Sequence, residues 1–348
     1  MLNKDQNQEL REGATAIQAG GNVTVGLTAT EARNIALDVA KATFFELSGA
    51  AKNTASERVE DITNKVIEKL KMNFPEGLQK AQDPDFQYAL FTVQKEYARN
   101  GDGDLGDLLV DLLVDRSKQD NRDILQIVLN ESLATAPKLT ETQLSCLAII
   151  FLFRYTRNYS VGNHALFGEY FDKHVKPFVS RIVKNNASYQ HLEFTGCGSI
   201  QMGEISLEDI LGQTYQGLFF KGFDSEEIES KGISIGCDPR FFIPCLNDPK
   251  KIQVSANDKD VLNTNLSLCS IHSDDREKII SLFDQGKMNS GEIRQTCIKI
   301  RPYMKNVFDI WADSPMKSFT LTSVGMAIGH ANIKRLIGEF ADLSIWVN

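Results

Sequence analysis

The sequence predicts a mainly α fold: an N-terminal β-hairpin, an antiparallel multi-helix domain, and then an α-rich domain with minor β-structure. Apolar residues recur at helical spacing over most of the chain, and helix-capping signals precede many of these segments. Glycine becomes more frequent, and the apolar pattern becomes mixed, between residues 189 and 270. We therefore expect a hairpin oligomerisation arm over residues 1–26, a helical domain over 27–187, and a mixed, mainly helical domain over 188–348.

The hairpin is predicted by two short alternating segments, residues 15–19 and 22–25, that flank Gly20-Gly21. Two-residue hairpin turns need positive φ angles, which glycine adopts readily. A lone two-stranded hairpin is marginally stable in water, and its outer edges keep unpaired N–H and C=O groups. We therefore expect this arm to pair with the same arm of another copy, which would make the protein a homo-oligomer.

The helices of the first domain are predicted from their start and stop signals. Thr28 and Glu31 form a capping box at the first helix, and Asp83 with Pro84 begins a later one that ends at Asn100-Gly101. The remaining helices are expected from about Ala55 to Asn73 and over residues 105–116, 123–134, 140–156 and 165–183, with a kink at Pro177. Short loops between such helices are typical of antiparallel packing.

The second half is predicted to mix short strands, ordered loops and helices. Residues 189–270 favour strands or loops, apart from one short helix that begins at Ser206. Longer helices are expected over residues 273–285, 290–312 and 323–340, and Pro302 should kink or split the second of these. Residues 343–347 alternate like an edge strand or form an apolar tail.

Composition narrows the class of protein. The 348 residues are 42% hydrophobic and carry a formal net charge of −8, which argues against general binding to nucleic acid or anionic membranes. The longest apolar run, residues 146–153, is far shorter than the roughly 20 residues of a membrane span. The polar opening predicts no signal peptide, and six cysteines without a Cys-x-x-Cys pair suit a reducing compartment. We expect a cytoplasmic protein.

Two segments have partial metal-site patterns. Residues 100–107 resemble a calcium loop, but the twelfth position counted from Asp102 is Leu113 where an EF-hand needs glutamate. A helix start capped by Asp104 or Asp107 explains this segment with fewer assumptions. Cys269 and His272 have zinc-ligand spacing, whereas a structural zinc site needs four ligands, usually in two close pairs. The other cysteines and histidines of this region are His191, Cys197, Cys237 and Cys245.

No catalytic constellation is complete in the sequence. Cys197 lies in the turn Gly196–Ser199 with His191 nearby, but no orienting third residue can be named. No Gly-x4-Gly-Lys-Ser/Thr phosphate-binding loop is present. We therefore assign no catalytic residue, no cofactor and no metal ligand, and lean toward a non-enzymatic protein.

Several segments resemble known families. Residues 19–28, Glu31-Ala32-Arg33, and residues 86–91 and 107–113 resemble an uncharacterised family of bacterial helical proteins linked to genome conflict. Residues 321–328 resemble the closing Leu-Thr-x-x-Gly segment of abortive-infection alpha proteins, although Asn332 stands near the place where that pattern has a cysteine. The resemblance implies a bacterial cytosolic protein with a role in phage defence, and it transfers no catalytic residues.

We therefore expect a non-enzymatic, homo-oligomeric protein that acts through assembly and protein–protein contact in antiphage defence. Its expected partners are further copies of itself, through the hairpin, and a phage or host protein; no membrane contact is expected, and nucleic acid is not favoured. Two alternatives stay open at this point. One is a metal-dependent hydrolase or nuclease with its site in residues 190–275, and the other is a DNA-reading helical module at residues 314–340.

Overall fold

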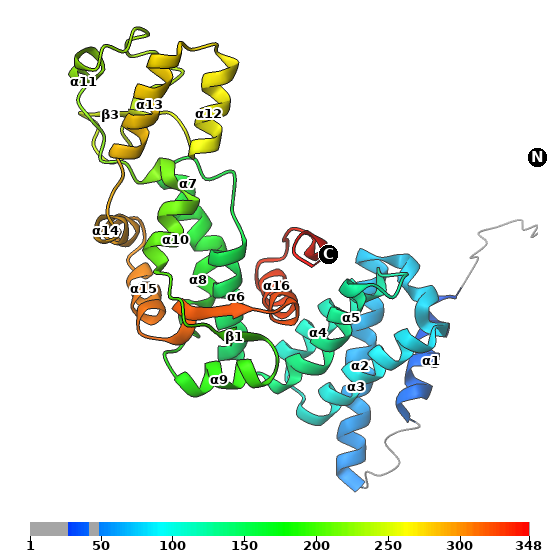
Figure 1. Ribbon diagram of the computed structural model, residues 1–348. Helices are drawn as coiled ribbons and strands as arrows, with labels where there is room; N and C mark the ends of the chain where they lie inside the picture. Colours follow the sequence, from blue (N-terminus) through cyan, green and yellow to red (C-terminus); the bar gives the residue numbers. More distant parts are fainter. Residues whose placement is uncertain (1–26, 42–48, 348) are drawn as a thin grey trace, which may run out of the picture.

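The computed structural model describes residues 27–41 and 49–347, so the predicted hairpin arm over residues 1–26 lies outside the described residues. Helices make up most of the described chain, which confirms the predicted mainly α class. Two groups of helices meet at an angle in Figure 1, and a smaller unit extends one of them. Nowhere in the described ranges does a helix have the length and apolarity needed to cross a membrane.

The first helices form a bundle, which we call the α1–α5 bundle. The predicted capping box is present, because Thr28 N donates to Glu31 Oε2 at 2.9 Å and Glu31 N donates to Thr28 Oγ1 at 3.2 Å. Asp83 caps α3 as predicted, and Gly101 ends it with a φ of 67°. The elements are α1 (Ala29–Lys41), α2 (Gly49–Asn73), η2 (Pro75–Gln82), α3 (Pro84–Asn100), α4 (Gly103–Ser117) and α5 (Ile124–Thr135).

Helix α4 corrects the predicted cap and buries one of the aspartates of residues 100–115. Asp102, not Asp104 or Asp107, caps the helix and accepts hydrogen bonds from two backbone N–H groups. Asp111 is buried at 3% exposure and forms an ion pair with Lys69 of α2 at 2.9 Å, so it does not lie on a solvated face. A helical pattern could not show this burial, because the partner that makes it tolerable comes from another helix.

A central helix, α6 (Glu141–Tyr155), follows the short η3 (Ala136–Lys138). It carries the predicted capping box between Thr140 and Gln143, and its apolar run is buried on nearly every side. The helix predicted over residues 165–183 is interrupted as expected before Pro177. It consists of α7 (His164–Tyr170), a π turn η4 (Phe171–Val175) and α8 (Lys176–Val179).

The second group of helices packs around α6 and a two-stranded sheet. Strand β1 (Gly198–Ile200) pairs antiparallel with β4 (Phe319–Leu321), with Gly198 opposite Leu321. Ser206 caps α10 as predicted, and the helix predicted over 290–312 is split near Pro302. The remaining elements here are α9 (Asn186–Phe194), α10 (Leu207–Thr214), η5 (Gln216–Leu218), α14 (Ser290–Ile300), α15 (Met304–Ala312), η6 (Pro315–Ser318) and α16 (Ser323–Ile337).

Residues 220–285 form a small unit with its own hydrophobic cluster, built around Phe220, Phe241 and Phe283. It stands at the top of Figure 1 and contains α11 (Glu226–Ser230), β2 (Phe242–Pro244), β3 (Ile252–Val254), α12 (Lys259–Leu268) and α13 (Ser273–Gln285). The pattern predicted strands and loops where α12 lies, so this helix was missed. The main hydrophobic cluster draws on the rest of the chain, from α1 to Val347.

Helix α16 contacts α6 on one side and α4 and α5 of the bundle on the other, so it joins the two groups of helices. Its glycines permit close backbone contact. A Cβ atom at Gly329 would lie 3.0 Å from the carbonyl oxygen of Leu147 in α6, and one at Gly325 would overlap the carbonyl oxygen of Cys197. Thr322 caps the helix and also donates its hydroxyl to Gly196 O at 2.6 Å. The Leu-Thr-x-x-Gly segment is thus a structural joint.

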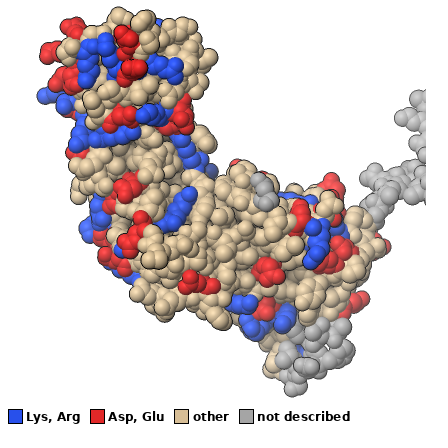
Figure 2. All heavy atoms as spheres, in the orientation of Figure 1, with Lys and Arg blue, Asp and Glu red and all other residues tan. Residues whose placement is uncertain are grey.

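The chain ends in a segment that we call the C-terminal strap, residues 338–347. It contains a single short turn, η7 (Leu343–Ile345), and it buries Leu343 and Val347. Of the two alternatives for this segment, the structure has the apolar tail. On the face shown in Figure 2, positive and negative side chains are interspersed over both groups of helices, and few cover the bend between them.

We predict that Gly325→Ala lowers the free energy of unfolding by about 3 kcal/mol, because the added methyl group overlaps the backbone of Cys197 and neither backbone can rotate away. Urea unfolding of the full-length protein measures this loss. Gly103→Ala is the matched control, since nothing lies within 4 Å of a Cβ atom there. Equal stability of the two variants would show that the joint is not rigid.

Candidate functional site

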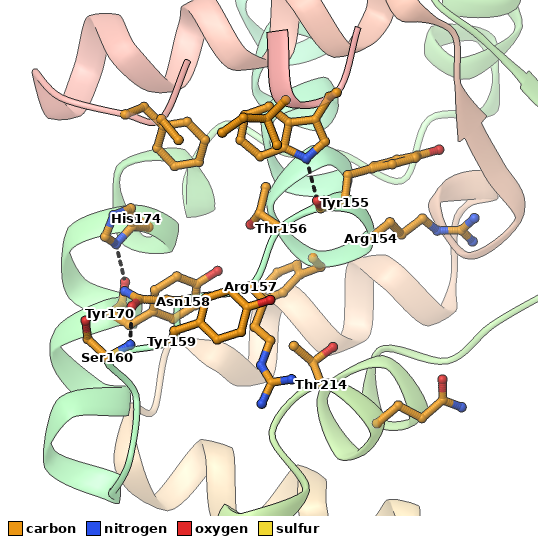
Figure 3. A pocket seen from close by; sticks show the side chains of 16 residues that line it. Arg154, Tyr155, Thr156, Arg157, Asn158, Tyr159, Ser160, Tyr170, His174 and Thr214 are labelled. Atoms are coloured by element: carbon orange, nitrogen blue, oxygen red, sulfur yellow. Dashed lines mark hydrogen bonds between the residues drawn. The ribbon is translucent and has the colours of Figure 1, made fainter. Parts of the chain in front are cut away.

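A cavity of about 810 Å³ lies at the C-terminal end of α6 (Figure 3). It lies between the loop that follows α6 and the C-terminal strap, and helices α7 and α10 complete its walls. Its volume is in the range of small-molecule sites. The lining residues are Phe153, Arg154, Tyr155, Thr156, Arg157, Asn158, Tyr159, Ser160, Tyr170, His174, Gln213, Thr214, Phe340, Ala341, Ile345 and Trp346.

The loop after α6 is held by hydrogen bonds that place its side chains at the cavity. Asn158 N donates to the hydroxyl of Tyr215 at 3.1 Å, and Asn158 Oδ1 accepts from Ser160 N at 3.0 Å. Between them, Tyr159 remains 80% exposed. The hydrogen bonds fix this loop, and the ring of Tyr159 nevertheless stays in solvent at the cavity. Such a ring offers a surface on which another aromatic ring can pack.

Aromatic rings line the cavity from two elements that are distant in sequence. Tyr170 of α7 is stacked on His174 with ring centroids 5.0 Å apart, and both lie at one end of the cavity in Figure 3. Phe340 and Trp346 of the strap are stacked at 6.0 Å with an angle of 19° between their planes. In Figure 3 the strap runs above the cavity, opposite Tyr159 and Tyr170.

The strap is fixed to the body by a few specific contacts. Trp346 Nε1 donates to Tyr155 O at 2.7 Å, the upper dashed line in Figure 3. The ring of Trp346 also packs edge-on against Phe151 of α6 at 5.0 Å. From α16, His330 Nε2 donates a hydrogen bond to Ala341 O of the strap at 2.6 Å. These contacts make the strap a wall of the cavity.

Two arginines line the cavity. Arg154 donates Nη2 to Lys317 O, lies 5.8 Å from the ring of Trp311, and forms no ion pair with any carboxylate in the described part of the chain. Burial lowers its pKa, although a guanidinium stays charged at neutral pH. Arg157 pairs with Asp258 at 2.7 Å and lies over the ring of Tyr159 at 5.0 Å.

Two titratable side chains of the cavity, Tyr170 and His174, are held neutral. Burial, followed by the neighbouring Tyr215, raises the pKa of Tyr170 well above its usual range, and burial lowers the pKa of His174. The lining contains no Asp or Glu. The arrangement can therefore stack on a flat molecule and attract negative charge, and the neutral phenol of Tyr170 can donate a hydrogen bond.

A second, smaller cavity of about 190 Å³ lies on the far side of the strap. Phe340 and Ala341 line both cavities, so the strap is the partition between them. The second cavity also contains the ion pair of Asp115 with Lys334 at 2.9 Å, together with buried His330. Movement of the strap would therefore change both cavities together.

The structure does not bring together the cysteines and histidines singled out from the sequence. His191 lies on α9, where Nδ1 is 3.0 Å from Gln143 Nε2, and Cys197 is buried beside β1. The others, Cys237, Cys245, Cys269 and His272, belong to the small unit. Throughout residues 27–41 and 49–347 no group of three or more His, Cys, Asp or Glu side chains could hold a metal ion.

Each of these motifs has a structural role or setting instead. Burial raises the pKa of Cys197, which keeps its thiol protonated and a poor nucleophile. His272 caps α13 by accepting from Asp274 N at 3.4 Å. Sequence reasoning missed the cavity, although residues 154–159 carry a usable signal: two arginines and two tyrosines directly after the most apolar run of the chain.

We predict that acid weakens the protein partly through His330. Burial lowers the pKa of this imidazole below its usual value of about 6.5, with smaller opposing effects of Asp115 and Asp342 and a supporting one of Lys334. Protonation is therefore harder in the folded state, and stability falls as pH drops from about 7 to 5. Urea unfolding at several pH values should show a smaller fall in His330→Gln.

His272→Gln is the control for that measurement, because this side chain is 75% exposed and should leave the fall unchanged. Any fall that remains in His330→Gln is assigned to His174, whose pKa burial also lowers. An identical pH dependence of the wild type and His330→Gln would contradict the role of His330.

Comparison with known proteins adds a family but no activity. No curated protein and no solved structure matches the chain at a significant level. A family model whose description assigns no activity matches residues 26–347, which is more than nine-tenths of the sequence. The chain therefore belongs to this uncharacterised protein family.

Proposed function

We propose that the chain is a non-enzymatic binding protein that holds a small aromatic molecule in the cavity beside the strap. In this proposal it acts by assembling with other copies of itself and by contacting a phage or host protein. The observation that carries the binding role is the lining of the cavity. It combines stacked aromatic rings from α7 and the strap with an exposed ring, Tyr159, on a loop fixed by hydrogen bonds.

The chemistry of the lining supports binding better than catalysis. General acid–base catalysis uses groups that change protonation near neutral pH, and carboxylates and histidines are the usual ones. Here the phenol of Tyr170 is kept protonated by burial, the arginines keep their charge, and burial lowers the pKa of His174, the one histidine of the lining. The lining has no carboxylate that could act with His174 as a second acid–base group.

The assembly role draws on the sequence of the N-terminal arm. The alternating segments around Gly20-Gly21 favour a hairpin whose edges need a partner, and a second copy of the arm supplies one. The resemblance of residues 321–328 to abortive-infection alpha proteins supports a role in bacterial antiphage defence.

We predict that the neutral fluorescent dye N-phenyl-1-naphthylamine binds the full-length protein, with a dissociation constant in the micromolar range typical of an unoptimised aromatic ligand (about 8 kcal/mol). Thr214→Trp, which places a large ring in the wall of the cavity, should weaken this binding at least tenfold. Fluorescence titration measures both constants.

Met72→Trp is the matched control, since Met72 lies at 71% exposure on α2, away from the cavity lining. It should bind the dye like the wild type. Absence of dye binding, or equal binding to Thr214→Trp, would overturn the small-molecule role.

We predict that light scattering finds full-length protein as a dimer or larger assembly, and a truncation that begins at Leu27 as a smaller particle. The physical reason is loss of the edge-to-edge pairing between hairpin arms. Circular dichroism should show that the truncation stays helical. An unchanged particle mass would contradict assembly through the arm.

A further inference from the structure

Resting on the proposed binding role, we infer that the ligand of the cavity is a planar aromatic anion: a flat ring system that carries a phosphate, carboxylate or sulfonate. The inference joins two features of the same lining, its aromatic walls and its unbalanced positive charge.

The aromatic walls select a flat ring. The strap presents the stacked pair Phe340 and Trp346, and Trp346 is fixed in place because its Nε1 is bonded to Tyr155 O. Tyr159 and Tyr170 lie across the cavity from the strap in Figure 3. Offset-stacked and edge-to-face aromatic pairs gain free energy beyond what their buried area gives, so rings on opposite walls suit a planar aromatic molecule between them.

Arg154 supplies charge that the protein does not neutralise. Its Nη2 donates to a carbonyl oxygen of Lys317, its Nε is buried without a hydrogen-bond partner, and no carboxylate of the described residues pairs with it. A half-buried guanidinium without a counter-ion is costly, because its field is poorly screened by solvent. An anion bound in the cavity would supply the missing counter-charge.

Arg157 adds a second cation at the loop. Asp258 offsets part of its charge, but the ion pair uses Nη2, and Asp258 also accepts from Val261 N at 2.8 Å as the cap of α12. Because the lining has two arginines and no acidic residue, the cavity keeps net positive charge even when Asp258 is counted. A cationic ligand would meet repulsion, and a neutral one would leave Arg154 uncompensated.

Nucleoside monophosphates and simple aromatic acids both have this chemistry, and the test separates them. The first step compares two dyes with one ring skeleton: N-phenyl-1-naphthylamine, which is neutral, and 8-anilinonaphthalene-1-sulfonate, which carries a sulfonate. We expect the sulfonate dye to bind full-length protein about tenfold more tightly and to displace the neutral dye. Raising the salt concentration should weaken the binding of the sulfonate dye alone, since salt screens the attraction between the sulfonate and the arginines.

Variants locate the charge. Arg154→Met should weaken binding of the sulfonate dye about tenfold and change binding of the neutral dye less than twofold. We expect this variant to fold, because the substitution removes an uncompensated cation. Lys305→Met is the matched control: it removes one positive charge from an exposed ion pair with Asp309 on α15, outside the cavity, and should leave both dyes unchanged.

Competition then identifies the source of the anion. Adenosine monophosphate, 1-naphthoate and inorganic phosphate are each titrated against the bound sulfonate dye. Displacement by the monophosphate or the naphthoate, with no displacement by phosphate at equal concentration, supports a ring-bearing anion and names its type.

The failures are distinguishable. Equal affinity of the two dyes, or an unchanged sulfonate affinity in Arg154→Met, overturns the anionic ligand and leaves the aromatic binding role standing. Displacement by inorganic phosphate alone overturns the requirement for a ring. Binding of neither dye overturns the proposed function itself.

Discussion

The close contact of α16 with its neighbours is the constraint on which the rest of the structure depends. Gly325 lets the first turn of α16 lie against the backbone at Cys197, and Gly329 lets the same helix lie against Leu147 of α6. On its other side α16 packs against the bundle in the same continuous hydrophobic cluster, and Lys334 pairs with Asp115 and Arg335 with Asp104. The joint to α6 and β1 therefore rests on close backbone contact, and the joint to the bundle rests on buried apolar side chains and ion pairs.

The cavity inherits its geometry from this joint. The strap leaves the C-terminal end of α16, so the position of α16 on α6 decides where Phe340 and Trp346 lie relative to the loop after α6. Two hydrogen bonds then secure the strap, from His330 to Ala341 O and from Trp346 to Tyr155 O. The second bond joins residues 191 positions apart in the sequence. Because the strap lies between two cavities and lines both, its position sets the shape of each.

The sequence predicts local structure here far better than it predicts the site. Caps are local signals: Asp83 precedes its helix and Thr140 pairs with Gln143, so the side chains that decide these helix starts are neighbours. Asp258 was an equally local cap for α12, and this helix was missed because the mixed apolar pattern of residues 189–270 favoured strands and loops. Burial of Asp111 could not be predicted, since Lys69 lies on another helix. The cavity could not be predicted for the same reason. Its walls come from segments that are distant in sequence, and no local pattern shows that they are in contact.

The cavity is also where the molecule departs from the rules that its other parts obey. In the bundle, buried charge is compensated, as Lys69 compensates Asp111, and exposed polar groups cap helices. At the cavity, Arg154 keeps its charge without a carboxylate and Tyr159 keeps its ring in solvent. The unpaired charge of Arg154 and the exposed ring of Tyr159 each lower stability. Substitution of either residue by a smaller neutral one would remove that cost. Departures of this kind are concentrated at functional sites, because a charge or ring that the protein already pairs internally cannot also pair with a ligand. Arg154 lacks a negative partner, and the ring of Tyr159 lacks an apolar face to pack against. One flat anion would supply both.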